Sequence, residues 1–577
     1  MKRTLILAWF ALLSTLSPAE PLVVHVRIYY QQTIPQLTIT PTNGSFQLRT
    51  CQTCTGKPIR TAMTLTAKSD TVGAESKKYS ALFFSGNYRL DIPEHPRFSA
   101  PYPLEIQSIG GHLRLTLSLP LEDYVAAVLA AEAGNFDSDQ ALQAMAVAAR
   151  TFAVHFRGRH PGFDFCDTTH CQDFRFSGID DRIRAAVDAT EGELLWYQGT
   201  TAATYYHQNC GGRTASGHDV WPTNKFSYLR EQVDPYCSRN SSGSWQSVIS
   251  KSDLQQALRS GDLHVPDEWQ TVEVLKRTPG GRAVQLGLVS KTGTPVRISA
   301  SSFRFAVDRS LGWNQIRSDF YEVRDSGQQL VFSGRGAGHG VGLCQAGALE
   351  MGHEGKGYRD ILSFYYPGTS VGLTAQGFSW ESRSNERLEL VSTRAKQDER
   401  LLEIANQMMR QAEERSGLRF DFHPRLKIYP SIETYRDSTG EPGWVAASTR
   451  GQTIRLQPAE ILQGQAILRR TLRHEFLHQL IEARARPGIP LWFREGLTLY
   501  LADNPEPQAG ELPPAKLEDV LAHSHDRNEL QMAYSTAKLN VATLIQHNGK
   551  EAVLGWLSTG LPTEIAGRFR ISQASQH

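Results

Sequence analysis

The sequence predicts an α+β protein made of several domains, and three observations lead to this fold class. A chain of 577 residues exceeds what a single hydrophobic core holds, at roughly 150 residues per domain. Apolar residues alternate near the beginning of the chain, with the period of a half-buried strand. The period then changes to that of a helix in two regions, one near residue 130 and one that covers most of the chain after residue 386.

Residues 1–19 have the pattern of a secretory signal. A positively charged start precedes an apolar stretch over 5–16, and small residues come before a cut after Ala19. The apolar stretch is too short to span a bilayer, which needs about 20 apolar residues, and no later segment is long enough. We therefore expect a secreted or periplasmic protein that has no transmembrane segment once the signal is removed; an uncleaved anchor is the alternative.

The composition excludes several classes of partner and structure. Lys and Arg number 61 against 59 Asp and Glu, a net charge of +2, so no nucleic acid partner is indicated. Hydrophobic residues at 40% and charged residues at 21% are typical of globular proteins. Seven cysteines cannot all pair within one chain, so at least one thiol must be free, bound to metal or paired with another chain.

The first half of the chain is expected to change from strands to helices and back. Residues 20–100 form a β-rich lead, since apolar side chains alternate over 22–30 and Pro and Gly then separate short strand-like runs. Two helices follow, one from residue 121 and one over 142–156, the second with a capping box that starts at Asp137. Strand-like runs return over 272–331.

The second half is expected to be mostly helical. A linker is predicted at 371–385, because no clear period continues through it. After it, helical periodicity covers 387–416, 459–484, 492–502 and 534–546. The linker therefore separates two functional halves.

One carboxylate falls on the packed side of the first predicted helix. The apolar stripe at positions 121, 125 and 128 continues by helical spacing to Glu132, which alanines surround. Burial there would raise the pKa of its carboxyl, and an acid that stays protonated near neutral pH can protonate a glycosidic oxygen and then act as a base. The alternative is a structural glutamate that pairs with an arginine such as Arg150.

Four blocks of sequence resemble the SpoIID/LytB family, which comprises stage II sporulation protein D and the amidase enhancers. They are the stretch 120–153 around Glu132, the Tyr-His and Cys-Gly-Gly-Arg-Thr words within 206–237, the glycine-rich words of 336–348 and the Tyr-Tyr-Pro-Gly segment within 361–369. The resemblance implies a catalytic domain over 101–370 that acts as a lytic transglycosylase on peptidoglycan glycan strands.

The resemblance places the catalytic glutamate at Glu132. One acid and base is enough, because the 6-hydroxyl of the sugar closes on the anomeric carbon to give a 1,6-anhydro product, unlike the two-carboxylate glycosidases. Asp123, nine residues earlier, is expected to be structural. The expected substrate-binding residues of this domain are Arg150, His207, His339 and Gln345.

The alternating glycines over 334–342 do not predict a nucleotide-binding loop. No register supplies the third glycine of the dinucleotide pattern, and no Gly-Lys-Ser/Thr follows. We expect either a close-packed backbone that lines a groove or turns that need positive φ. The family usually has a serine where this chain has Cys344.

A Cys/His cluster lies between the first two blocks. Two thiolates and two imidazoles satisfy tetrahedral Zn²⁺. The spacing is not that of a standard finger, but it is similar to a zinc-binding insertion seen in some SpoIID-like proteins. A Cys166–Cys171 disulfide is the rival, and either role would be structural. The members of the Cys/His cluster are His160, Cys166, His170 and Cys171.

The other cysteines are expected to pair in part. Cys210 and Cys237 fall in one block of the resemblance, and a disulfide between them would stabilise the fold by roughly 3.5 kcal/mol. Cys51 and Cys54 lack the surroundings of a redox site, so a local disulfide or part of a metal knuckle is expected. Cys344 is then left with an unpaired thiol.

The sharpest pattern is the pentapeptide from His474 to His478. On a helix the two histidines lie one turn apart on one face, so both can bind one metal, with Glu475 beside them to activate water. Farther along, the Trp-Phe-Arg-Glu-Gly word places Glu495 on a second helix as a third ligand and leaves the fourth position for water.

These words resemble the gluzincins, specifically the peptidase MA-like domains. The resemblance implies that residues 386–577 form a mostly helical zincin-type metallopeptidase domain with a catalytic Zn²⁺ held by His474, His478 and Glu495. Tyr534 is a candidate for stabilising an oxyanion. The alternatives are two structural histidines, or a metal site without catalysis.

Three hypotheses about function follow. The first is a two-enzyme cell-wall protein that cleaves glycan strands with its front half and a peptide or protein substrate with its second half. The second is a non-catalytic wall-binding module that stimulates a partner cell-wall amidase. The third is a secreted metallopeptidase with a wall-targeting front half. The presence of Glu132 favours the first over the second.

Overall fold

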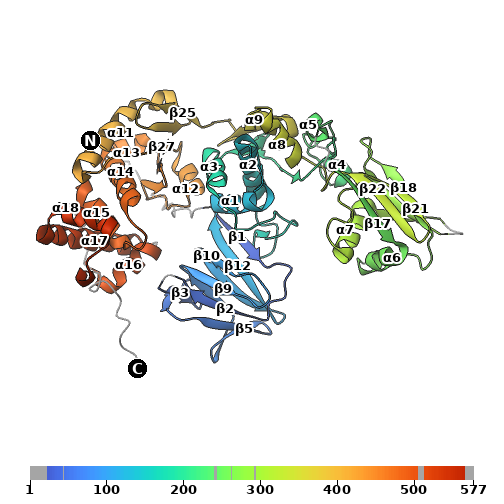
Figure 1. Ribbon diagram of the computed structural model, residues 1–577, viewed down its shortest axis with the longest axis horizontal. Helices are drawn as coiled ribbons and strands as arrows, with labels where there is room; N and C mark the ends of the chain where they lie inside the picture. The colour runs from blue at the N-terminus through green and yellow to red at the C-terminus, as the bar shows by residue number, and fades with distance from the viewer. Residues whose placement is uncertain are drawn as a thin grey trace, which may run out of the picture. The chain divides into compact units, whose positions relative to one another are not determined.

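The computed structural model describes residues 22–42, 44–221, 223–239, 243–261, 263–290, 294–503, 512–524 and 526–565 (Figure 1). The signal predicted at 1–19 lies outside these residues. The chain divides into two compact units, one of residues Val24–Ser379 and one formed mainly by the chain from Trp380 on. Across the described ranges, no helix is both long and apolar enough to cross a membrane.

The first unit begins with two β-sheets. A seven-stranded sheet has the order β13-β1-β12-β11-β8-β3-β4 and a six-stranded sheet the order β10-β9-β2-β5-β6-β7. Period-2 alternation buries one face of each strand; in β12 it buries Leu113, Leu115, Leu117 and Leu119. The strands are β1 Val23–Ile28, β2 Gln36–Pro41, β3 Phe46–Arg49, β4 Lys57–Ile59, β5 Met63–Lys68, β6 Thr71–Ala74, β7 Lys77–Tyr79, β8 Ala81–Ser85, β9 Tyr88–Asp91, β10 Phe98–Ala100, β11 Leu104–Ile109, β12 His112–Pro120 and β13 Phe165–Cys166.

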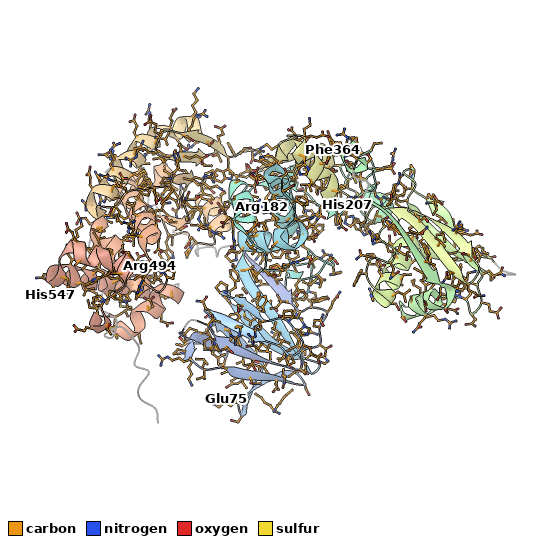
Figure 2. The ribbon with its side chains drawn as sticks, in the orientation of Figure 1. Glu75, Arg182, His207, Phe364, Arg494 and His547 are labelled. Carbon is orange, nitrogen blue, oxygen red and sulfur yellow. A yellow bond between two sulfur atoms is a disulfide. The ribbon has the colours of Figure 1, made fainter. Side chains whose placement is uncertain are left out.

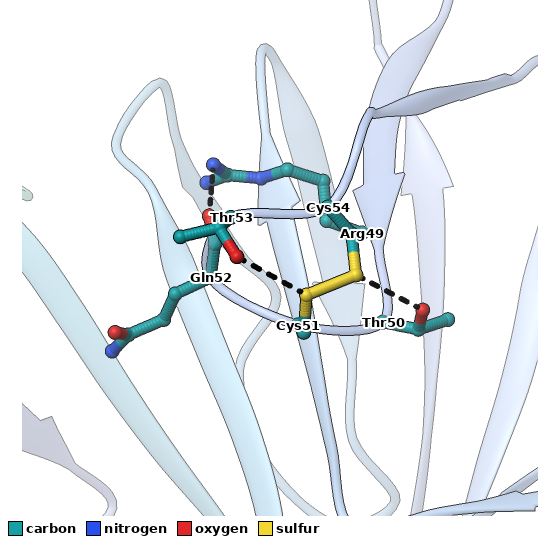
Figure 3. Close-up of a disulfide and its surroundings, with 6 residues drawn as sticks. All are labelled: Arg49, Thr50, Cys51, Gln52, Thr53 and Cys54. Carbon is teal, nitrogen blue, oxygen red and sulfur yellow. Dashed lines mark hydrogen bonds between the residues drawn. A yellow bond between two sulfur atoms is a disulfide. The ribbon is translucent and has the colours of Figure 1, made fainter.

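Cys51 and Cys54 form a disulfide in the connection between β3 and β4 (Figure 3). The guanidinium of Arg49 donates to the carbonyl of Gln52 inside the same loop at 3.0 Å. The prediction of a local disulfide at this pair is confirmed.

A buried helical layer follows the sheets. Helix α1, Leu121–Glu132, continues directly from β12, and α2 spans Asp139–Phe156. The capping box expected from Asp137 is wrong, because the hydroxyl of Ser138 caps α2 instead. Helices α8 and α9 lie against α2 (Figure 1). The remaining elements here are α3 Asp181–Ala189, β14 Leu194–Tyr197, β15 Thr200–Thr201, β16 Tyr206–His207, α4 Gly217–Val220, α5 Pro235–Ser238, β23 Leu343–Cys344, α8 Gln345–His353, α9 Tyr358–Tyr365 and β24 Ser370–Gly372.

The region between α5 and β23 has a hydrophobic core of its own and two three-stranded sheets. The strands predicted over 272–331 are present, but α7 was not predicted there. Its signals were the Ser299 cap and the apolar spacing of Phe303, Ala306 and Val307. The elements are β17 Ser244–Ser250, α6 Lys251–Ser260, β18 Thr271–Arg277, β19 Ala283–Val289, β20 Val296–Ser299, α7 Ala300–Leu311, β21 Tyr321–Ser326 and β22 Gln329–Arg335.

The second unit combines helices with a five-stranded sheet of order β25-β26-β27-β29-β28. This sheet was not predicted, because its strands are only four residues long and too short to show a clear period. The predicted helix over 387–416 therefore starts with β26, and the predicted linker contains β25. The elements are β25 Glu381–Ser384, β26 Glu389–Ser392, α10 Ala395–Asp398, α11 Arg400–Ser416, β27 Arg425–Ile428, α12 Ile432–Thr439, β28 Ala447–Arg450, β29 Thr453–Leu456, α13 Ala459–Gly464, α14 Leu468–Arg484, α15 Leu491–Ala502, α16 Pro514–His523, α17 Arg527–Asn548 and α18 Lys550–Thr559.

Candidate active sites and metal-binding clusters

Glu132 is the last residue of α1, and two other segments hold its carboxylate. The backbone N–H of Asp173 donates to Oε1 at 3.0 Å, and the side-chain amide of Gln345 donates to Oε2 at 3.2 Å. Burial raises the pKa of the Glu132 carboxyl, although both hydrogen bonds oppose the rise. The carboxyl is thus biased towards its protonated form while its orientation is fixed, and a general acid needs both properties.

Two phenols and an amide adjoin this carboxyl. Tyr124 donates to Gln172 Oε1 at 3.1 Å, and Gln172 Nε2 donates to the hydroxyl of Tyr206 at 2.8 Å. Burial first, and the charge of Glu132 among the further causes, raise the pKa of both phenols. These residues were not among the predicted site residues. Gln172 directly follows the Cys/His cluster in the sequence, but sequence position alone does not show that its loop reaches α1.

Arg150 does not contact Glu132. Its guanidinium makes two hydrogen bonds to the carboxylate of Glu122, at 2.8 and 2.7 Å, and the residue is 0% exposed. The substrate-binding role expected for Arg150 is therefore wrong, since no part of the guanidinium reaches the surface. Asp123 pairs with Arg184 at 2.8 Å, in agreement with the structural role predicted for it.

The two predicted histidines lie side by side. His207, labelled in Figure 2, and His339 have ring centroids 5.5 Å apart, and the His339 ring also packs against Trp221 at 5.0 Å. Burial lowers the pKa of His207 to about 3 and that of His339 well below its usual range. Nε2 of His207 is buried and finds no hydrogen-bond partner among the described residues. Both rings are therefore neutral near pH 7.

The glycine-rich segment packs closely against the chain around His207. Gly336 and Gly342 have positive φ, +81° and +73°. A Cβ atom at Gly342 would collide with the carbonyl oxygen of Tyr205. Both expectations for these glycines, close packing and positive φ, therefore hold at Gly342. The close approach lets β23 pair with β16, which brings Gln345 to Glu132.

The Cys/His cluster converges as the sequence predicts. Its four ligand atoms lie within 4.8 Å of one another. Cys166 Sγ is 3.2 Å from Cys171 Sγ and 3.6 Å from His170 Nδ1, and His160 Nε2 is 3.1 Å from Cys171 Sγ. Both thiols are free, so the rival disulfide is not formed. Two sulfurs and two imidazole nitrogens in this arrangement fit tetrahedral Zn²⁺, whose ligand atoms lie about 3.3 to 3.8 Å apart at normal bond lengths.

The disulfide expected between Cys210 and Cys237 is absent, because both thiols are free and share their surroundings with a third. Cys344, which we expected to be alone, is 134 residues from Cys210 in the sequence, yet its Sγ accepts a hydrogen bond from the backbone N–H of Cys210 at 3.2 Å. The pairing of β16 with β23 produces this proximity. The three-cysteine cluster consists of Cys210, Asp234, Cys237 and Cys344, with all ligand atoms within 4.8 Å of one another.

A third group of ligands lies in the second unit. His474 and His478 lie one turn apart on α14, and Glu495 lies on α15. The Glu495 carboxylate is 3.7 Å from His474 Nε2 and 3.0 Å from His478 Nε2. These three residues form the two-histidine site, and two imidazoles with one carboxylate fit a catalytic Zn²⁺ that keeps an open position.

The charges of the two-histidine site are strongly coupled. Against the effect of burial, the charge of Glu495 raises the pKa of His478 to about 9. The charge of His478 lowers the pKa of Glu495 to about 2, again against burial. Burial and the neighbouring His478 lower the pKa of His474 to about 4. In the absence of metal, His478 and Glu495 thus form an ion pair. Such a pair is what the alternative of two structural histidines would require.

Glu475 lies beside the ligands and is buried. Thr449 on β28 donates its hydroxyl to Glu475 Oε2 at 2.7 Å, so the sheet that was not predicted orients this carboxylate. Burial raises the pKa of Glu475. Burial, followed by the charges of Glu495, Glu441 and Glu475, also raises the pKa of the Tyr534 phenol, which places Tyr534 near the two-histidine site.

The glycine after Glu495 has a packing role. A Cβ at Gly496 would collide with the carbonyl oxygen of Ala537 on α17. Only glycine allows α15 and α17 to approach this closely, and this contact sets the position of Glu495 against α14. Arg494, labelled in Figure 2, forms an ion pair with Glu482 on α14 and so joins the same two helices.

The first unit therefore has the architecture of a β-rich domain in which strand β12 leads into a buried helix, α1, that ends on an acid. Residues 110–197 match the Stage II sporulation protein (SpoIID) family, and residues 237–342 match a Domain of unknown function (DUF8618). Through its first unit the chain belongs to the SpoIID family, as the four blocks predicted.

Several relatives match part of the chain. The chain is 30% identical over 257 residues to an uncharacterized protein of Brachyspira hyodysenteriae, covering 44% of this chain and 67% of the relative. It is 27% identical to the stage II sporulation protein D of Bacillus subtilis, covering 44% of this chain and 75% of that protein. It is also 27% identical to the amidase enhancer of Bacillus subtilis, covering 40% of this chain and 38% of the enhancer.

Proposed function

We propose that the first unit is a lytic transglycosylase that cleaves the glycan strands of peptidoglycan outside the cytoplasmic membrane. The observation that carries this proposal is the Glu132 carboxyl, whose pKa burial raises while two donors fix its orientation. The kinship with proteins named stage II sporulation protein D and amidase enhancer supports a role at the cell wall.

In this reaction Glu132 acts twice. Its protonated carboxyl gives a proton to the glycosidic oxygen as the C–O bond breaks. The resulting carboxylate takes the proton of the sugar's 6-hydroxyl, whose oxygen bonds to the anomeric carbon and leaves a 1,6-anhydro end. The amide of Gln345 and the N–H of Asp173 stabilise the carboxylate between the two steps. The proton returns to Glu132, so the reaction needs no second carboxylate.

A group of neutral aromatic side chains in the same unit suits the rings and hydroxyls of a sugar. His339, Trp221 and Tyr205 form a partly buried aromatic group, and the imidazole of His339 stays neutral. Aromatic faces and neutral ring nitrogens contact sugar rings and hydroxyls. We therefore retain His207, His339 and Gln345 as the residues that bind the glycan.

The test compares the mature chain with Glu132→Gln on two substrates: denuded peptidoglycan, from which the stem peptides have been removed, and intact peptidoglycan. Mass spectrometry counts the 1,6-anhydro ends that form. Glu268→Gln, the same substitution at an exposed position of the first unit, is the matched control. We expect product with the wild type and with the control, and a loss of at least about 100-fold in Glu132→Gln. Wild-type protein that binds wall and stimulates an amidase without anhydro product would favour the non-catalytic alternative.

We propose a zinc-dependent peptidase activity for the second unit. Its specific support is the convergence of two imidazoles and a carboxylate next to the buried acid Glu475. When bound, Zn²⁺ would polarise the scissile carbonyl and acidify water. Glu475 would accept a proton and pass it to the leaving amine, and Tyr534 would donate to a developing oxyanion.

A peptidase assay with Glu475→Gln tests this activity. The variant should retain zinc, because Glu475 is not a ligand, and should lose at least about 100-fold in cleavage of a peptide or protein substrate. Glu403→Gln, the same substitution at an exposed position on α11, is the control and should cleave normally. Equal rates in the wild type and Glu475→Gln on every substrate, including wall stem peptides, would contradict the peptidase proposal. The proposed glycan cleavage by the first unit would not be affected.

A further inference from the structure

The three-cysteine cluster is a buried set of donors that the proposed chemistry does not use. Its three cysteines and its aspartate are exposed by at most 2%. They come from three separate segments of the first unit: the turn after β16, the start of α5, and β23. The Cys237 thiol donates to Asn209 Oδ1 at 3.2 Å in the absence of metal, and three sulfurs with one carboxylate are a donor set that metal ions bind.

A single disulfide would satisfy these groups poorly. Bonding two of the sulfurs would leave the third thiol and the Asp234 carboxylate enclosed together. Oδ2 of Asp234 lies 3.2 Å from Cys210 Sγ, and the same oxygen accepts a hydrogen bond from the hydroxyl of Tyr365 at 2.9 Å. Oδ1 accepts from the backbone N–H of Cys237 at 2.9 Å. The carboxylate is thereby turned towards the sulfurs and held there.

Two donors lie beside the sulfurs. The backbone N–H of Cys210 donates to Cys344 Sγ at 3.2 Å. The buried guanidinium of Arg282 donates through Nη2 to the carbonyl of Cys210 at 2.7 Å, which places a positive charge next to the cluster. Three thiolates and a carboxylate carry four negative charges, and a divalent cation with one arginine offsets most of this charge.

We propose that Cys210, Asp234, Cys237 and Cys344 bind one Zn²⁺ ion in a closed, structural site. Three sulfur ligands select Zn²⁺ over Mg²⁺ or Ca²⁺, and donors within 4.8 Å of one another hold a single ion. Four protein ligands leave no open position, so the ion is not catalytic. Each thiol that binds loses its proton to solvent, and the hydroxyl of Tyr365 keeps Asp234 oriented.

The site would fasten together segments that are distant in sequence. Cys344 directly precedes Gln345, whose amide donates to Glu132, so the ion would fix the register of that donor. This consequence for Glu132 rests on the proposed function, whereas the metal content of the cluster does not.

The test measures the zinc content of the full mature chain, purified without reductant or chelator, by inductively coupled plasma mass spectrometry. Cys344→Ser is the informative variant, since serine is nearly isosteric with cysteine but lacks the thiolate that binds zinc. We expect Cys344→Ser to hold one zinc fewer per chain than the wild type. Cys51→Ser/Cys54→Ser, which changes two cysteines outside the cluster, should keep the wild-type content. The Cys/His cluster and the two-histidine site are intact in both variants.

A second readout on the wild type keeps the proposal testable if Cys344→Ser does not fold. Unfolding without reductant, followed by alkylation and peptide mapping, should find Cys210, Cys237 and Cys344 all as free thiols. Exchange of zinc for Co²⁺ should give a sulfur-to-cobalt charge-transfer band that weakens in Cys344→Ser. A disulfide between any two of the three cysteines, or equal zinc content in wild type and folded Cys344→Ser, would overturn the proposal.

Discussion

Removing the amide of Gln345 should shift the pH range in which Glu132 works. In Gln345→Leu, Oε2 of Glu132 loses the donor at 3.2 Å, while the N–H of Asp173 remains on Oε1. A hydrogen bond to a charged group contributes about 1.5 to 3 kcal/mol, and about 1.4 kcal/mol corresponds to one pK unit. The loss affects the charged form more than the neutral form, because a carboxylate accepts the stronger hydrogen bond. The pKa of Glu132, already raised by burial, should therefore rise further by about 1 to 2 units.

The assay is the pH profile of kcat/KM on denuded glycan strands, with 1,6-anhydro ends counted by mass spectrometry. A general acid works only while it is protonated, so activity falls as the pH rises through the pKa of Glu132. In Gln345→Leu we expect this alkaline limb to lie about 1 to 2 pH units higher. Gln246→Leu, at an exposed position on β17, is the control and should leave the limb in place. A limb that is unmoved in Gln345→Leu, or moved to lower pH, would refute the reasoning.

Three further predictions concern stability and metal. Arg150→Met should destabilise the first unit by about 3 to 5 kcal/mol in denaturant unfolding, because it leaves the Glu122 carboxylate buried without its partner; a loss below about 1 kcal/mol would contradict this. Gly496→Ala should destabilise the second unit by about 1 to 3 kcal/mol in thermal unfolding, because its Cβ would collide with Ala537. Gly555→Ala is the control; its Cβ would lie in open space on α18, so the same assay should find it neutral or stabilising. Zinc bound at the two-histidine site should dissociate as the pH falls, because protons compete for its ligands, and dialysis at stepped pH followed by metal analysis checks this; retention at pH 3 would count against the site.

Local periodicity predicted the elements that bear the key residues but not their partners. The stripe over α1 placed Glu132 at the end of the helix, where the residue is partly buried, because spacing along a helix depends on neighbouring residues alone. Its donor Gln345 is 213 residues away and reaches it through the pairing of β16 with β23, which no local pattern contains. Arg150 shows the opposite case. It lies in a stretch that resembles the family, so we expected it to bind substrate, but its guanidinium pairs with the carboxylate of Glu122.

The same limit applies to the cysteines and to the second unit. The Cys/His cluster could be predicted since its four members lie within one short loop. The three-cysteine cluster could not, because Cys344 joins it from a distant strand. In the second unit, two sequence words predicted His474, His478 and Glu495. Thr449, which orients Glu475, could not be predicted, because its strand has four residues and is too short to show a period.

The single-acid reaction at Glu132 is tested most directly by cleaving denuded glycan strands in water enriched in ¹⁸O. If the 6-hydroxyl of the sugar attacks the anomeric carbon, the new ends are 1,6-anhydro sugars that carry no ¹⁸O, and Glu132→Gln produces none of them. New reducing ends in place of anhydro ends would show that water is the nucleophile, and the absence of any new ends would show that this unit does not cleave glycan; either result contradicts the account.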